Sequence, residues 1–489
     1  MFLKAFICSN CGKKYYLPLD KNLNVCINCK GILLAFYDIE KIKEKLNKEE
    51  LSKRRFSVWK YRELLPLVKE SNIISLGEGG TFLHKCEKLA SKLGLKLLYV
   101  KNETTNPTGS FLDRGSTIEV SHAVELNVNS VYCATSSGNF AASIAAYAAR
   151  GGLKCNIFIP LERIKELNLG KLYQAIIYGA NLIVDKHYYD KNELSNLGYS
   201  ISPINPFFAE GEKTTGYELC EQLNWILPDK IIVPMGHGEH LSMIWKGIKE
   251  FFDLGLINSI DVGMVGVQAA EFAPIVNEFQ GKKVKLQTPK TVALDLAMEK
   301  PLYAKLALDS IKESKGIAVK VSDDEIFKAM EMLAKMEGIF AEPSAASTIA
   351  AVIKLLNEGR IDRNETIVCV ITGAGLKDPV SARKFVEKIK KINRIISGVE
   401  SKRFTKKLGE TKFKLLKILL NESYGYEIWK TLKNMGIDLD ISSVYQHLAE
   451  LEVMGLIKRI KVERVLGKPA RIYYSLTDKG EEVLRKTSF

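Results

Sequence analysis

The spacing of hydrophobic and polar positions changes along the 489 residues of this chain. Between about Ser75 and Pro379, short runs rich in β-branched residues alternate with longer stretches rich in Ala and Leu. This alternation is typical of a parallel sheet with helices on both faces. It predicts strands at 96–101, 130–134, 154–159, 230–234, 261–267 and 366–372, and helices at 141–150, 244–253 and 345–357.

From Thr411 the pattern becomes one of short amphipathic helices. Three helices are expected at 413–420, 424–433 and 441–454, with Asp440 as N-cap of the third. The next residues alternate polar and apolar positions around Gly467-Lys468-Pro469 and predict a β-hairpin, and a helix resumes at 481–486. Three helices followed by a hairpin is the order of a winged helix-turn-helix domain.

Composition is that of a globular protein, with 46% hydrophobic and 26% charged residues, which excludes wholesale disorder. No apolar run reaches 18 residues, and the apolar stretch at the N-terminus is too short for a secretory signal. We therefore expect a cytoplasmic protein without membrane contact. Net charge is +14, and residues 401–489 hold 18 Lys and Arg against 11 Asp and Glu. This basic C-terminal module favours nucleic acid as a partner.

Nine cysteines, an odd number, argue against a disulfide scaffold. Cys8-x2-Cys11 and Cys26-x2-Cys29 form two pairs separated by 14 residues. Four thiolates in two knuckles make a closed tetrahedral site, so the pairs predict structural zinc. The alternative is four solvent-facing thiols. The other five cysteines stand singly among apolar neighbours, and we expect them to be buried free thiols.

These patterns divide the chain into five segments. We expect a zinc ribbon at 1–34, a helical lead segment at 35–75 that packs against the next domain, an α/β core at 76–395, a linker at 396–410 and a winged helix domain at 411–489.

Four glycine-containing loops follow predicted strands and lead into the next segment. They lie at 106–115, 134–139, 234–240 and 372–379. In parallel α/β folds, ligands bind beyond the carboxyl ends of strands, beside helix N-termini. Together the four loops predict one binding cleft.

The order of these loops and their amino-acid sequences resemble those of the threonine synthase family. The members of this family are pyridoxal-phosphate enzymes of fold type II (the tryptophan synthase β fold). The resemblance covers Cys8 to about Pro379 and rests on the two cysteine pairs and on WKYRELLP, SLGEGGTFL, NPTGSFLDRG, SSGNFAAS, IFAEPSAAS and TGAGLKDP. It implies a two-lobed parallel-sheet core.

The resemblance also implies roles for the loops. It implies that Asn139 bonds the phenolic oxygen of the cofactor, that Gly236 and Gly238 belong to a phosphate cradle, and that Thr372 bonds the pyridine nitrogen. Ser136, Ser137 and Gly138 would meet the carboxylate of an amino acid, although they also suit simple capping of the following helix.

Two positions depart from the family. The family's Schiff-base lysine corresponds to Leu112, which has neither a nucleophile nor a titratable proton. In the phosphate loop, Glu239 replaces a glycine and would repel a phosphate. His237 or His240 could offset that charge if protonated, or all three side chains could point outward and leave the cradle intact. We expect no catalytic residue and pyridoxal phosphate bound at most non-covalently.

The C-terminal segment resembles the PadR-like transcription regulators through YGYEIWKTL, SSVYQHLAELEVMGLI and GKPARIYYSLTDKG. On the third helix, Ile441, Val444, Leu448 and Leu451 should face the core. The residues free to reach bases or phosphates of double-stranded DNA are Ser442, Ser443, Gln446, Arg464, Lys468 and Arg471. A winged helix used only for protein contact is the alternative.

Together these features predict a catalytically inactive threonine synthase-like protein that acts as a homodimeric, DNA-binding transcription regulator. Its effector would be an amino acid or a phospho-amino acid. Two alternatives stay open: a threonine synthase-like lyase with an accessory domain, and a pseudoenzyme partner of a true threonine synthase.

Overall fold

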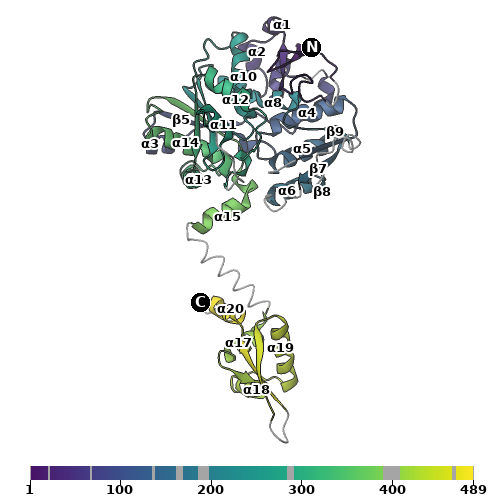
Figure 1. Cartoon of the computed structure of the whole chain (residues 1–489), viewed down its shortest axis with the longest axis vertical. Helices are drawn as coiled ribbons and strands as arrows, with labels where there is room; N and C mark the ends of the chain where they lie inside the picture. Colours follow the sequence, from purple (N-terminus) through teal and green to yellow (C-terminus); the bar gives the residue numbers. More distant parts are fainter. Residues whose placement is uncertain are drawn as a thin grey trace. The chain divides into compact units, whose positions relative to one another are not determined.

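The computed structural model in Figure 1 describes residues 2–19, 23–66, 69–134, 138–160, 169–185, 198–282, 291–388, 408–464 and 470–487. The chain forms two compact units, Met1–Arg383 and Lys384–Phe489.

The first unit begins with a small antiparallel sheet of order β2-β1-β3, followed by short helical turns. These elements are β1 (Leu3–Cys8), β2 (Lys14–Tyr15), β3 (Leu33–Tyr37), α1 (Ile39–Lys43), α2 (Lys48–Ser52), η1 (Val58–Leu64) and η2 (Glu70–Asn72). Val58, Tyr61 and Leu64 are fully buried in the same core cluster as Phe251 of the α/β core. The lead segment therefore packs against the core, as its sequence predicted.

The larger α/β sheet has the order β12-β11-β10-β13-β5-β4, parallel except for the edge strand β4. Its strands are β4 (Phe82–Lys85), β5 (Leu97–Asn102), β10 (Lys230–Pro234), β11 (Gly263–Ala269), β12 (Ile317–Val321) and β13 (Thr366–Ile371). Successive side chains enter different cores: Ile231 and Val233 join one cluster, and Ile232 joins another. The sheet is therefore buried on both faces.

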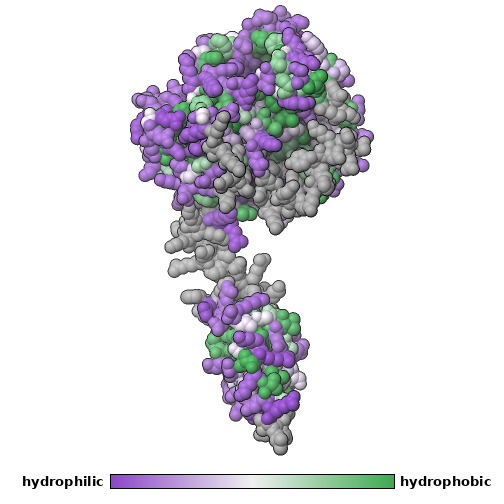
Figure 2. Space-filling model, in the orientation of Figure 1, coloured by the Kyte–Doolittle hydropathy of each residue, from purple (hydrophilic) through white to green (hydrophobic). Residues whose placement is uncertain are grey.

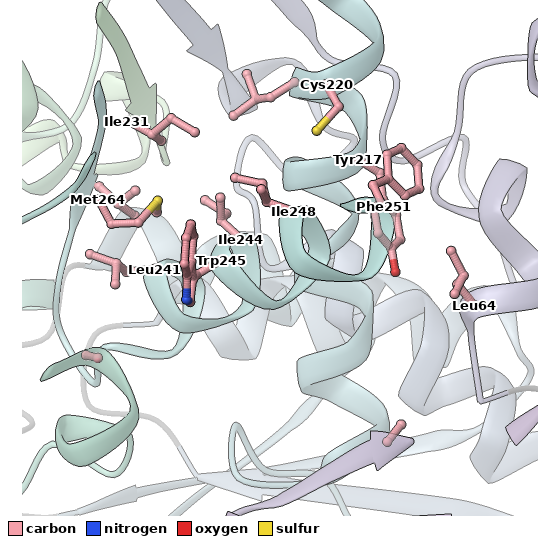
Figure 3. Close-up of a cluster of buried hydrophobic side chains, with 14 of the residues drawn as sticks. Leu64, Tyr217, Cys220, Ile231, Leu241, Ile244, Trp245, Ile248, Phe251 and Met264 are labelled. Atoms are coloured by element: carbon pink, nitrogen blue, oxygen red, sulfur yellow. The ribbon is translucent and has the colours of Figure 1, made fainter. Parts of the chain in front are cut away.

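Helices cover both faces of this sheet. They include α3 (Glu87–Leu93), α9 (Thr214–Gln222), α10 (Glu239–Asp253), α11 (Pro274–Phe279), α12 (Ala304–Glu313), α13 (Asp323–Glu337) and α14 (Pro343–Asn357). Further helical elements are α8 (Pro206–Glu212), α15 (Pro379–Lys388) and the turns η3 (Glu103–Thr105), η6 (Leu294–Leu296) and η7 (Gly375–Lys377). In α10 the apolar residues recur at helical spacing, so Leu241, Trp245 and Ile248 share one buried stripe against the sheet. Figure 3 shows this stripe facing Ile231 of β10 and Met264 of β11.

A second, smaller parallel sheet has the order β8-β7-β6-β9. Its strands are β6 (Ser130–Ala134), β7 (Lys154–Pro160), β8 (Asn181–Asp185) and β9 (Tyr199–Ser200), and its helices are α4 (Asp113–Glu125), α5 (Asn139–Arg150) and α6 (Leu169–Ile177). These elements enclose their own core cluster, which includes Val131, Ile144 and Ile157. Figure 1 shows β7, β8, α5 and α6 as a lobe apart from β5, α3, α13 and α14. The two-lobed parallel-sheet core predicted from the sequence is therefore confirmed.

The second unit contains the predicted helices and hairpin. They are α17 (Glu410–Ile418), β14 (Ser423–Tyr424), α18 (Gly425–Asn434), α19 (Ile441–Val453), β15 (Ile457–Glu463), β16 (Arg471–Leu476) and α20 (Asp478–Thr487). Val444, Leu448 and Leu451 are buried as expected, and Asp440 accepts the capping hydrogen bond from the Ser443 amide. Ile441 was assigned to the core wrongly: its side chain is 38% exposed, because this first residue of α19 lies beyond the packed turn.

The face of the molecule in Figure 2 is largely hydrophilic, with apolar residues in small scattered patches. Among the described residues, no helix is long and apolar enough to cross a membrane.

Candidate functional site

The four glycine-containing loops converge on one cavity of about 160 Å³. Each loop contributes lining residues, as the order of the strands predicted. The lining residues are Phe111, Leu112, Ala134, Asn139, Phe140, Pro203, Pro234, Gly236, His237, Gly238, Glu239, His240, Asp295, Leu296, Met298, Glu342, Ser344 and Thr372.

Hydrogen bonds from the neighbouring chain segments fix the loop before α4. The Asp113 carboxylate accepts bonds from the Thr108 amide and hydroxyl, both at 2.7 Å, and from the Ser143 hydroxyl at 2.5 Å. The Phe111 amide donates to the carbonyl of Thr372, at 3.0 Å. These bonds fix the positions of Phe111 and Leu112 at the cavity wall.

Leu112 stands immediately before α4, and its partly buried side chain packs against the core of the smaller lobe. It presents only hydrocarbon to the cavity. Among the described residues that line the cavity, none is a lysine or an arginine. An amine that could form an imine is therefore not part of this described wall.

A polar cluster not anticipated from the sequence closes one part of the wall. The Asn139 amide nitrogen donates to both carboxylate oxygens of Glu342, at 3.1 Å each. The Lys171 ammonium lies 2.8 Å from Asp295 and 3.2 Å from Glu342. Burial works against this ammonium, but the two carboxylates outweigh it and hold the pKa of Lys171 above its usual range.

Gly138 allows Lys171 to reach this cluster. It caps α5 with a φ of +92°, and a Cβ at this position would lie 2.7 Å from the Lys171 Cβ. Both the left-handed backbone and the close approach therefore require glycine. The sequence offered no signal for Lys171 or Asp295, because neither stands in a glycine-rich loop; Glu342 lies in IFAEPSAAS, to which we had assigned no role.

Two buried lysines of the α/β core, Lys101 and Lys377, lie outside this wall. Lys101 is 2.5 Å from Glu218, within a network in which Arg114 donates to Glu103 and to Glu218 at 2.7–2.9 Å. All four side chains are fully buried. Lys377 donates to the Thr108 carbonyl at 2.6 Å, and burial lowers its pKa to about 8.

The loop before α10 carries the clearest departure from a phosphate cradle. Gly238 has a φ of +88°, and its amide and that of Glu239 begin the helix. Glu239 is only 6% exposed and His240 only 4%, and both line the cavity. The alternative in which these side chains point outward is therefore wrong. Burial also lowers the pKa of His237 to about 4 and that of His240 to about 3, so neither imidazole carries a positive charge near neutral pH.

Three buried polar atoms at the cavity lack a hydrogen-bond partner within the described part of the chain: Asn139 Oδ1, Glu239 Oε1 and His240 Nδ1. Two further carboxyls near Glu239, those of Glu119 and Glu212, also lack partners there. Burial raises the pKa of all three glutamates well above its usual range, with mutual repulsion adding to the effect for Glu239 and Glu212.

The four N-terminal cysteines form a second candidate site. Their sulfur atoms all lie within 4.8 Å of one another, with Cys8 and Cys29 at 3.4 Å and Cys11 and Cys26 at 3.6 Å. Tetrahedral zinc thiolates place sulfurs about 3.8 Å apart. The set could therefore hold a metal ion, whereas the other five cysteines are buried free thiols, as expected.

The predicted DNA-binding residues are only partly free. Ser442 and Gln446 are exposed on α19, and Arg464 is exposed after β15. The Ser443 hydroxyl instead donates to the Asp440 carboxylate at 3.0 Å, so it serves the helix cap. Arg471 lies over the Tyr424 ring, 5.0 Å from its centre. Ser136, Ser137 and Lys468, also predicted as site residues, lie outside the described residues.

Comparison with known families agrees with this geometry. Residues 74–373 match the family described as "Pyridoxal-phosphate dependent enzyme", and residues 415–486 match the "Transcriptional regulator PadR-like family". The first match spans more than half of the chain and contains the cavity.

Individual proteins agree as well. The chain is 47% identical to a threonine synthase of Methanocaldococcus jannaschii over 79% of this chain and 96% of that protein. It is 39% identical to a threonine synthase of Methanosarcina acetivorans, over 76% and 92%. Maize serine racemase shares the fold, with a TM-score of 0.53 at 20% identity over 63% of this chain and 92% of that one. The chain therefore belongs to the pyridoxal-phosphate-dependent enzyme family, with threonine synthases among its homologues, and carries a PadR-like winged helix domain at its C-terminal end.

Proposed function

We propose that this protein is a catalytically inactive relative of threonine synthase that acts as a DNA-binding transcription regulator. Its cavity would sense an amino-acid-like or phospho-amino-acid effector. The observation that carries the proposal is that Leu112 presents hydrocarbon to the cavity, in a chain that also has a PadR-like domain. The sequence resemblance assigns this position to the family's Schiff-base lysine. Leucine can neither hold a cofactor as an imine nor move a proton.

The described residues do not fit covalently held pyridoxal phosphate. No amine lies at the described cavity wall, and the first residue of α10 is the buried, cavity-lining Glu239, where a phosphate cradle would favour a glycine. Asn139 and Thr372 still line the cavity, which supports retention of a ligand site. Non-covalent binding of the cofactor is the most that this wall supports.

For DNA binding, the exposed Ser442 and Gln446 on α19 support contacts to base edges, and Arg464 supports a phosphate contact. Ser443 and Arg471 would contribute less, because each already has a partner within the domain. A homodimer would pair two such domains on two half-sites.

The test is selection of sheared genomic DNA on the purified full chain at about 150 mM salt, followed by sequencing. We expect a few promoter sites with paired half-sites, and we expect an effector to change their occupancy. Recovery of only sequence-independent DNA, which higher salt removes, would contradict the regulator. Release of phosphate from O-phosphohomoserine would instead support the lyase.

We also propose zinc in the N-terminal cluster, held by Cys8, Cys11, Cys26 and Cys29. Four sulfur donors leave no open position for substrate, so this metal would be structural. Elemental analysis of the purified chain should find one zinc per chain. A Cys11→Ser variant should lose it, because the remaining three sulfurs do not complete the tetrahedron.

A further inference from the structure

The cavity wall is acidic, although the family to which the chain belongs handles phosphorylated ligands there. Three of the described lining residues are carboxylic acids: Glu239, Asp295 and Glu342. None of the described lining residues is a lysine or an arginine. Lys171, immediately behind the wall, already pairs with Asp295 and Glu342, and so it is not available to a ligand phosphate.

Two of the free polar atoms of this wall, Asn139 Oδ1 and Glu239 Oε1, are oxygens. Asn139 Oδ1 is an amide oxygen and can only accept a hydrogen bond, while the amide nitrogen of the same side chain already donates to Glu342. Glu239 Oε1 is buried and has no partner within the described residues. A buried polar atom without a partner costs free energy, and a bound ligand removes that cost when it supplies the missing group. The groups missing at these two oxygens are donors.

A phosphate ligand does not supply the donors that these two oxygens lack. It offers acceptors and negative charge, whereas the residue at the start of α10 that lines the cavity, Glu239, carries a carboxyl. His237 and His240 are neutral near pH 7, so they offer a phosphate no positive charge. Phe111, Leu112 and Met298 supply an apolar wall that suits a short aliphatic chain.

We propose that the cavity binds a small organic cation with a primary ammonium group and no phosphate, with the ammonium on Glu239 and a second N–H donor on Asn139. Basic amino acids and diamines have this chemistry. The assignment rests on the proposed sensing function, because it names the ligand class of the same cavity and excludes its phosphorylated members.

Isothermal titration of the full chain tests the assignment with matched probes. The amine probes are L-ornithine, L-lysine and putrescine. L-Norleucine has the carbon chain of lysine without its side-chain ammonium, and O-phosphohomoserine and inorganic phosphate are the anionic probes. We expect at least one amine to bind about tenfold or more tightly than L-norleucine and both anions.

Glu239→Gln should remove this preference, since it keeps the size of the side chain but removes the carboxyl that would ionise against a bound ammonium. Glu239→Gly, which restores the family's residue, should shift the preference toward phosphate. The matched control is Glu271→Gln on the exposed surface after β11, which should leave every affinity unchanged. The melting temperature of each variant without ligand separates a loss of binding from a loss of folding.

The assignment is overturned if no amine binds at up to about 10 mM, if an anion binds the unaltered chain more tightly than every amine, or if Glu239→Gln keeps the preference. DNA selection with and without the best amine separates this result from the sensing function. Amine binding that leaves DNA occupancy unchanged contradicts the sensor and leaves the ligand class standing. If DNA occupancy responds only to O-phosphohomoserine, the result supports the sensor and contradicts the ligand class.

Discussion

Two buried polar regions of the α/β unit differ in how completely their charges are paired. In the network of Lys101, Glu103, Arg114 and Glu218, each ionised group meets a partner of opposite charge at hydrogen-bond distance. At the cavity, by contrast, the carboxyl of Glu239 has a free oxygen within the described residues. A fully paired network stabilises one conformation, whereas an incomplete one in a well-packed fold marks the place of a ligand.

The largest effect should come from breaking the paired network. Arg114→Met would leave Glu103 and Glu218 buried without their main counter-charge, and it should lower the free energy of unfolding by about 3–5 kcal/mol. Urea unfolding measures this change. Glu239→Gln at the cavity is the matched comparison and should leave stability equal or higher, because it removes a buried carboxyl with a free oxygen. Equal losses in the two variants would contradict the distinction.

The two regions should also respond to pH in opposite directions. Burial raises the pKa of Glu119, Glu212 and Glu239 above the ordinary 4.5. Their stabilising contribution is complete below that value and is lost as pH rises toward the raised pKa, at about 1.4 kcal/mol per pH unit for each group. The Arg114 guanidinium outweighs burial and lowers the pKa of Glu103 and Glu218, so their contribution is present above 4.5 and is lost in acid.

Unfolding measured from about pH 5 to about pH 8 tests this prediction. Glu119→Gln should reduce the loss of stability on the alkaline side, and Glu271→Gln should not. A Glu119→Gln variant with an unchanged pH dependence would show that this carboxyl is ionised in the folded chain.

Lys171 offers an intermediate case. It pairs with Asp295 and Glu342, but the Asp295 side chain is 22% exposed, so water can solvate part of the charge left behind. Lys171→Met should therefore cost about 1–3 kcal/mol, less than Arg114→Met. If Lys171→Met lowers the free energy of unfolding as much as Arg114→Met does, the cluster of Lys171, Asp295 and Glu342 behaves like the fully paired network, which contradicts this prediction.

The smallest effect should come from an exposed pair in the winged helix domain. Arg459 lies 2.9 Å from Glu452, with side chains 54% and 31% exposed. Arg459→Ala should change stability by less than about 1 kcal/mol, because water screens the pair. Thermal unfolding of the full chain, with Lys458→Ala as control, measures it.

The fold was largely predictable from local pattern. The six predicted strands and three core helices match observed elements, with ends that differ by a few residues, because the period of apolar residues is a local property. The convergence of the loops also followed, because strand ends of a parallel sheet share an edge. The pairing of Lys171 with Asp295 and Glu342 was not predictable from local pattern. Asp295 lies 124 positions after Lys171 and Glu342 lies 171 positions after it, so these side chains meet only after folding.

The same limit applies to the orientation of side chains. Sequence alone left open whether Glu239 faces solvent or the cavity, and packing against the rest of the lobe decides it. Ser443 looked free on the helical wheel, but a local hydrogen bond to Asp440 engages it. Ile441 was misassigned because helical spacing says nothing about where the core ends.

The division of the nine thiols has a practical consequence for chemical labelling. The five cysteines outside the N-terminal cluster are all buried, and burial raises the pKa of Cys86 and Cys155 to about 12. Alkylating reagents attack thiolates, so these five should stay unmodified in the folded chain at neutral pH. Cys11 and Cys29 are exposed. Mass spectrometry after brief alkylation should therefore read the occupancy of the N-terminal cluster directly, as mass added to the metal-free chain and not to the loaded one.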